Sequence, residues 1–133
     1  DVEDTGPALF LLGDGTTQVL ALNQDGSVNA EGNAAARGEI VVLYATGTGA
    51  WDRAWADGFP GGDPYPKPAA AIRLEIGDRT AELRWFGMAP GMVGVVQMNA
   101  VVPVGGQGSG RIPVVLRAGS KASGASAASL MVK

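Results

Sequence analysis

The chain contains neither cysteine nor histidine. It therefore lacks thiolate nucleophiles, imidazole bases and the usual nitrogen and sulfur ligands of zinc and haem. Disulfides are excluded, although a secreted domain of 133 residues can fold without them. From this composition we expect no cofactor, no metal centre and no enzyme activity.

The chain also has no large excess of charge of one sign and no long apolar run. The net charge is −3 and the ten basic residues are scattered, whereas nucleic-acid binding requires a basic stripe. No apolar run approaches the ~20 residues that a membrane-spanning helix needs. We therefore expect no nucleic-acid partner and no membrane insertion.

Short strands joined by turns are what the remaining composition favours. Apolar residues make up 46% of the chain, with 21 glycines and 8 prolines, which predicts a single β-rich domain over residues 1–133. The clearest strand is Glu39–Thr46, whose alternate positions are apolar on both faces. This pattern predicts a central strand that is covered on both sides.

Other strands are predicted from short runs between turn signals, at residues 8–12, 16–22, 70–76, 80–86, 95–103, 112–118 and 129–132. Alternation in 70–76 and 80–86 predicts a hairpin around Gly77–Asp78, with Trp85 on the same face as Ala81 and Leu83. The spacing predicts an antiparallel β-sandwich of about 7–9 strands with Greek-key connections. A small closed barrel is the alternative.

Two segments fall outside this strand pattern. Residues 1–7 form a polar leader, and 47–68 form a long loop that carries Trp51, Trp55, Phe59 and Tyr65. These aromatic side chains are either a surface for stacking sugars or contacting a partner, or a satellite core folded over one end of the sandwich.

The same loop carries three carboxylates, Asp52, Asp57 and Asp63. A glycosidase needs two carboxylates across a cleft, but their spacing does not indicate such a pair. A solvated loop is the interpretation that the sequence favours.

An apolar run, Ala8, Leu9, Phe10, Leu11 and Leu12, follows the polar leader. It is either the first strand of its own sandwich or a donor strand that completes the sheet of a neighbouring subunit. The second interpretation predicts a filament in which copies of the chain are partners.

The stretch Asn23-x-Asp25-Gly26-x-x-Asn29 resembles part of a calcium loop. With Gly26 at the sixth position, Ala21 and Gly32 occupy the first and twelfth positions, where oxygen ligands are required. A plain turn, in which Asn and Asp bond their own backbone, is favoured instead.

Several runs carry a family resemblance: ALNQDGSVN at 21–29, AARG at 35–38, LYATGTG at 43–49, IGDRTAELRWFGMAPGMVG at 76–94, QMNAVVP at 97–103 and IPVVLRAG at 112–119. Together they resemble the uncharacterised C-terminal domain family first described from Solibacter proteins, found at the ends of large secreted bacterial proteins. The family's IGG-x-x-A turn appears as Ile76-Gly77-Asp78 followed by Ala81, one glycine short.

This resemblance implies an immunoglobulin-like sandwich and export, and it implies no catalytic activity. A first residue other than Met agrees with a processed, exported chain. We therefore expect an extracellular or cell-surface module with a structural or interaction role. A self-assembling filament subunit and a carbohydrate-binding module that uses Trp51 and Trp55 are the alternatives.

Overall fold

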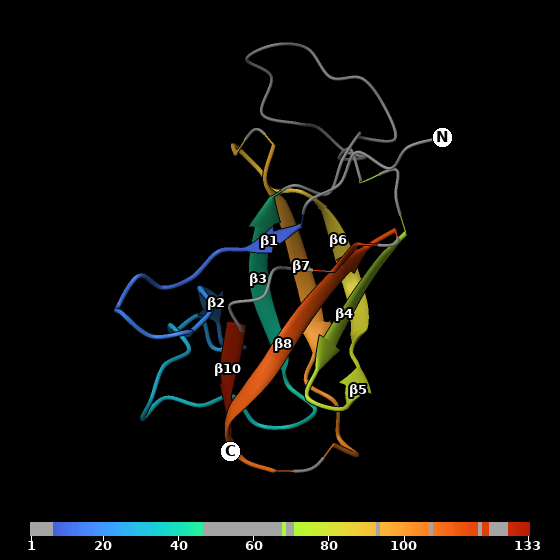
Figure 1. Ribbon diagram of the computed structural model, residues 1–133. Helices are drawn as coiled ribbons and strands as arrows, with labels where there is room; N and C mark the ends of the chain where they lie inside the picture. The colour runs from blue at the N-terminus through green and yellow to red at the C-terminus, as the bar shows by residue number, and fades with distance from the viewer. Residues whose placement is uncertain are drawn as a thin grey trace.

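The computed structural model describes residues 7–46, 68, 71–92, 94–106, 108–119, 121–122 and 128–133. Within these ranges the regular structure is entirely β, and no helix occurs. The strands form two antiparallel sheets, one behind the other in the view of Figure 1. The two-layer, all-β architecture predicted from the sequence is thus confirmed at this level.

Among the described residues, each sheet has five strands. The first has the order β1 (Ala8–Leu9), β3 (Ile40–Thr46), β7 (Val96–Val101), β6 (Glu82–Met88), and β2 (Ala21–Leu22) also pairs with β3. The second has the order β10 (Ala128–Val132), β8 (Gly110–Ala118), β4 (Ile72–Ile76), β5 (Arg79–Thr80), and β9 (Lys121–Ala122) also pairs with β8.

The core lies between the facing sheets. Its largest fully buried side chains include Leu43 and Met98 from the first sheet and Leu74, Leu116 and Leu130 from the second. These residues occupy alternate positions of their strands, as expected where one face of each sheet packs on the other. Figure 1 shows β8 crossing diagonally in front of β3 and β7.

The predicted hairpin of residues 70–86 is only partly correct. The turn at Gly77–Asp78 is present, but of residues 80–86 only Thr80, in the two-residue strand β5, pairs with β4. Ala81, which is 5% exposed, still donates its amide to Leu74 O, and the chain then joins the other sheet as β6. The buried alanine thus marks the point where one continuous run changes sheets.

The outer edge of β10 is closed by the N-terminal part of the chain. Val19 N donates to Ser129 O, and Ser129 N donates to Thr17 O. Further along the same edge, Ala35 N donates to Met131 O. Because exposed strand edges invite pairing with other chains, this seam protects the second sheet at β10.

The prediction that β3 is covered on both faces is confirmed for one face only. Val41, Leu43 and Ala45 are fully buried, whereas the alternate residues, Val42 and Tyr44 among them, are half-buried. Strand β3 is central in its sheet, with β7 on one side and β1 and β2 on the other. Its second face therefore lies outside the core, and the apolar residues there are partly exposed.

Candidate functional site

A β-bulge in β6 decides the direction of Trp85. Leu83 pairs with Ala100 and Trp85 with Asn99, so Arg84 is the extra residue. Leu83 and Phe86 pack against the core, and Trp85 does not belong to it. A bulge shifts the alternation of a strand by one residue. Trp85 therefore lies on the outer face, and its predicted place beside Ala81 and Leu83 is wrong.

Side-chain amides occupy the middle of this outer face. Gln97 and Asn99 alternate along β7 with Met98 and Ala100, which are fully buried, so the two amides point outward. Gln97 Nε2 donates to Asn99 Oδ1 at 3.0 Å. Both amides keep further donors and acceptors, since each carries two N–H groups and an oxygen with two lone pairs.

Aromatic groups flank the amides diagonally. Tyr44 is opposite Gln97 on β3, and Trp85 is opposite Asn99 on β6. Two strand spacings and a two-residue offset along the strands separate the two aromatic positions by about 12 Å. We call Val42, Tyr44, Trp85, Gln97 and Asn99 the uncharged face.

Along the outer face of β3, β6 and β7, charged side chains occur only at one end of β6. The outward positions of β3 and β7 carry no Lys, Arg, Asp or Glu. On β6, Glu82 and Arg84 form an exposed ion pair with N–O distance 2.9 Å. A ligand on the uncharged face would therefore meet amides, aromatic rings and aliphatic groups.

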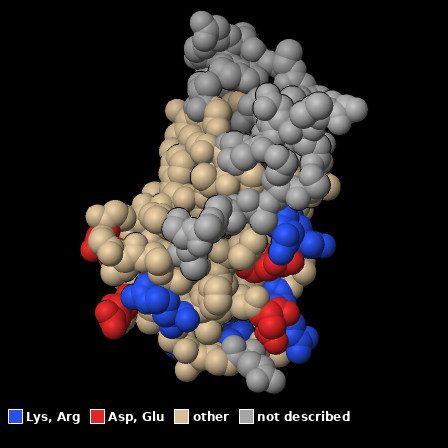
Figure 2. Space-filling view, viewed as in Figure 1, with Lys and Arg blue, Asp and Glu red and all other residues tan. Residues whose placement is uncertain are grey.

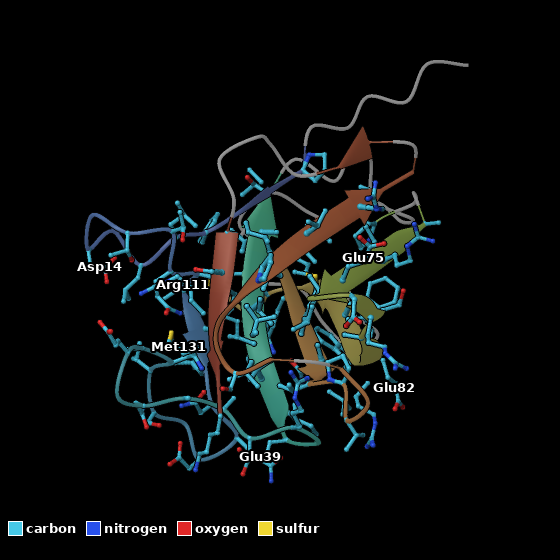
Figure 3. The ribbon with its side chains drawn as sticks, turned by 60° about the horizontal axis from the view of Figure 1, so that its bottom comes forward. Asp14, Glu39, Glu75, Glu82, Arg111 and Met131 are labelled. Carbon is cyan, nitrogen blue, oxygen red and sulfur yellow. The ribbon has the colours of Figure 1, made fainter. Side chains whose placement is uncertain are left out.

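The outer face of the second sheet has the opposite character. Glu75 on β4 lies 3.5 Å from Arg73 Nε and 3.2 Å from Arg117 Nε. Figure 2 shows blue and red groups side by side over the lower part of this side of the molecule. Figure 3 shows Arg111 near Asp14 and beside β10, whereas Glu75 lies on the opposite side of the view. Ion pairs that remain in contact with solvent contribute little stability.

A buried polar network lies beneath the N-terminal loops. Asn29 is fully buried; its Nδ2 donates to Asn23 Oδ1 and Met131 O, and its Oδ1 accepts from Gln18 Nε2 and Met131 N, all at 2.9 Å. Its amide thus acts as a further peptide group along the edge of β10. This network joins three loop positions to the last strand.

The calcium interpretation of this stretch is not favoured by the geometry. The side-chain oxygens of Asn23 and Asn29 accept hydrogen bonds from within the network, and Asp25 Oδ1 accepts from Ser27 N and Oγ. Gly26 N donates to Asn23 O at 2.8 Å, which closes the predicted turn. Gly26 has a φ of 88°, a conformation that glycine adopts without strain.

Two exposed carboxylates are stabilised by local turns. The hydroxyl and backbone N–H of Thr16 lower the pKa of Asp14, and those of Ser27 lower the pKa of Asp25 in the same way. In each case the donors favour the ionised form. These groups order loops, and neither belongs to the uncharged face.

The predicted loop residues cannot be placed in this site. Trp51, Trp55, Phe59 and Tyr65, together with Asp52, Asp57 and Asp63, lie outside the described residues. In the described part of the chain, no group of three or more Asp or Glu side chains is arranged to hold a metal ion. Nor does that part contain a helix able to cross a membrane.

The apolar run at residues 8–12 lies within the chain's own first sheet. Ala8 and Leu9 pair with Thr46 and Ala45 of β3. On the other side, Leu12 N donates to Gln18 O, and Leu20 N donates to Phe10 O. Strand donation would require this segment to leave both neighbours, and it stays a prediction.

Sequence alternation missed Trp85, although a signal was present. Trp85 and Phe86 are adjacent large apolar residues, and Leu83, Phe86 and Met88 are spaced by three and then two positions. A regular strand has a period of two, so this irregular spacing indicates one extra residue. The alternation counted from one end of the strand is out of step with that counted from the other end, and this difference locates the bulge.

Comparisons with known proteins identified no relative of this chain. No family model matches this chain, and no curated protein or solved structure is similar enough to count as a match. The family resemblance therefore stays a prediction.

Proposed function

We propose that this chain is a non-catalytic, exported immunoglobulin-like module with a structural or interaction role at the cell surface, and that the uncharged face is its contact surface. The observation that carries the proposal is the bulge at Arg84, which turns Trp85 outward beside Gln97 and Asn99. Bulges commonly re-aim side chains next to functional sites. Tryptophan is also enriched among residues that dominate binding.

The frame beneath this face is suited to presenting a fixed surface. Two antiparallel sheets enclose a core of fully buried side chains, and the edge of β10 is closed by hydrogen bonds. Sites built on strands are held more precisely than sites on loops. Two facing antiparallel sheets are also the arrangement that an immunoglobulin-like topology with Greek-key connections requires.

The absence of catalytic side-chain types supports a binding role. Without histidine or cysteine, the chain must rely on carboxylates, hydroxyls, amines or Tyr for proton transfer. The uncharged face contains no carboxylate, and its tyrosine has no basic neighbour among the described outward residues of β3 and β7. Recognition by shape and hydrogen bonding is the chemistry that this face supports.

The proposal is tested by combining turnover and retention assays. Purified protein is incubated with ester, peptide, phosphate and glycoside substrates, and its saturable retention on separated protein and polysaccharide fractions of bacterial envelopes is measured. We expect no turnover, and retention that is lost in Asn99→Leu and Trp85→Ala but kept in Arg73→Ala on the opposite sheet. Turnover that disappears on replacing Asp52, Asp57 or Asp63 would contradict the proposal.

A further inference from the structure

The uncharged face combines two features that neutral sugars require. Pyranose rings present a C–H face that packs on aromatic rings, and a rim of hydroxyl groups that both donate and accept hydrogen bonds. Tyr44 and Trp85 supply the aromatic groups, one on each side of β7. Gln97 and Asn99 lie between them and supply both donors and acceptors.

The arrangement suits a chain of sugars. The two aromatic positions lie about 12 Å apart along a diagonal of the sheet, comparable with the length of a disaccharide. The Gln97–Asn99 hydrogen bond of 3.0 Å holds the amides in a defined orientation between them. A glycan lying along this diagonal would stack one ring at each end and direct its hydroxyls toward the amides.

Charge decides between classes of glycan. The outward positions of β3 and β7 carry no ionisable acid or base other than the Tyr44 hydroxyl, and the nearby Glu82 and Arg84 neutralise each other. An anionic glycan would lose its hydration without meeting a cation, which is unfavourable. A neutral glycan carries no such cost.

From these observations we infer that the uncharged face binds a neutral polysaccharide, with Tyr44 and Trp85 as stacking residues and Gln97 and Asn99 as hydrogen-bonding residues. This inference rests on the proposed binding function and names its ligand class. It places the sugar site on a sheet, at a distance in sequence from the Trp51 and Trp55 loop.

The test is affinity electrophoresis and calorimetry with defined neutral glucans, xylans, mannans and chitin oligosaccharides, together with alginate and heparin as anionic probes. We expect at least one neutral glycan to bind, with an affinity that 0.5 M NaCl leaves unchanged, because salt screens only charged interactions. Trp85→Ala and Asn99→Leu should each weaken binding at least tenfold. Gln97→Met removes the other amide at nearly constant size and should act in the same direction.

The controls separate a lost site from a lost fold. Arg73→Ala lies on the other sheet and should leave binding unchanged, and circular dichroism with thermal melting should show each variant to be folded. The inference is overturned if no neutral glycan binds at millimolar concentration, if only anionic glycans bind, or if binding survives both Trp85→Ala and Asn99→Leu. Self-association or a protein partner that depends on Trp85 would also overturn it, while leaving the proposed function intact; turnover of the glycan would instead overturn the proposed function.

Discussion

Replacing Asn29 with alanine should be among the most destabilising single changes in this chain. Its side chain is fully buried and forms four hydrogen bonds, two as donor and two as acceptor. Alanine leaves Gln18 Nε2, Asn23 Oδ1 and the backbone N and O of Met131 without these partners. Gln18 is only 1% exposed, so solvent cannot easily replace the lost bond.

The expected loss follows from these four bonds. At about 1 kcal/mol for each bond, and more where a buried group is left without a partner, the free energy of unfolding should fall by about 3–5 kcal/mol. That is a large part of the 5–15 kcal/mol typical of a domain. In urea it corresponds to a midpoint about 2 M lower.

Equilibrium urea unfolding, followed by circular dichroism, measures this difference. Asn33→Ala is the matched control, because its amide donates to Ser27 Oγ and Val28 O at exposed positions, and it should cost less than about 1 kcal/mol. Equal, small losses in Asn29→Ala and Asn33→Ala would refute the role assigned to the buried network.

The aspartate variant at the same position adds a pH dependence. In Asn29→Asp, burial and the facing oxygens of Asn23 and Met131 would raise the folded-state pKa above its unfolded value of about 3.9. The variant should therefore be most stable below that unfolded pKa and lose stability as the pH rises through the folded pKa. A variant that becomes more stable between about pH 4 and pH 7 would contradict this reasoning.

Three further predictions concern the bulge, a turn and a loop carboxylate. Phe86→Ala should cost about 2–4 kcal/mol and exceed the cost of Trp85→Ala by at least about 1 kcal/mol in urea unfolding, because only Phe86 packs on the core; the reverse order would show the bulge to be misplaced. Gly77→Ala should destabilise more than Gly91→Ala by thermal unfolding: both have positive φ, but only at Gly77 would a Cβ meet a side chain, at 3.1 Å, and equal costs would argue against that contact. The pKa of Asp14 is lowered from the ordinary value of 3.8, so this carboxylate should contribute stability that is present above that value and lost as the pH falls through the folded pKa. The Asp14→Asn variant should therefore lose less stability than the native chain on acidification. Carboxyl NMR should show a titration midpoint below 3.8 for Asp14.

Local patterns predicted much of the sheet framework. Strand β3 appears at Ile40–Thr46 where Glu39–Thr46 was expected, and β4 shows the expected burial of Leu74 and Ile76 opposite Arg73. Apolar alternation and turn residues carry this information, because both depend on neighbours a few positions away. The same signals correctly predicted the turn that ends at Gly26.

The features that shape the candidate site depend on register, which alternation alone does not determine. The bulge at Arg84 shifts Trp85 to the outer face, and the buried Ala81 carries the chain from one sheet to the other. Both features interrupt a segment whose sequence pattern is that of one regular strand. Leu83 and Phe86 both lie on the core side although they are three positions apart. This irregular spacing is the sign of the bulge that the sequence itself contains.

The buried network was missed for a different reason. Asn29 meets Met131 across 102 positions of sequence, and no local rule connects an asparagine in a turn to the edge of the last strand. In the sequence, Asn23 and Asn29 look like calcium ligands or turn residues. Only their long-range partners show that their amides serve as structural hydrogen-bonding groups.

We propose that function lies on the uncharged face. The most direct measurement is a two-dimensional ¹⁵N NMR titration of the intact protein with a neutral oligosaccharide that binds it. We expect concentration-dependent shifts at the Trp85 indole N–H and at the side-chain amides of Gln97 and Asn99, with β4 and β8 unaffected. Shifts confined to Arg73, Glu75 and their neighbours on the second sheet, with Trp85, Gln97 and Asn99 unchanged, would contradict it.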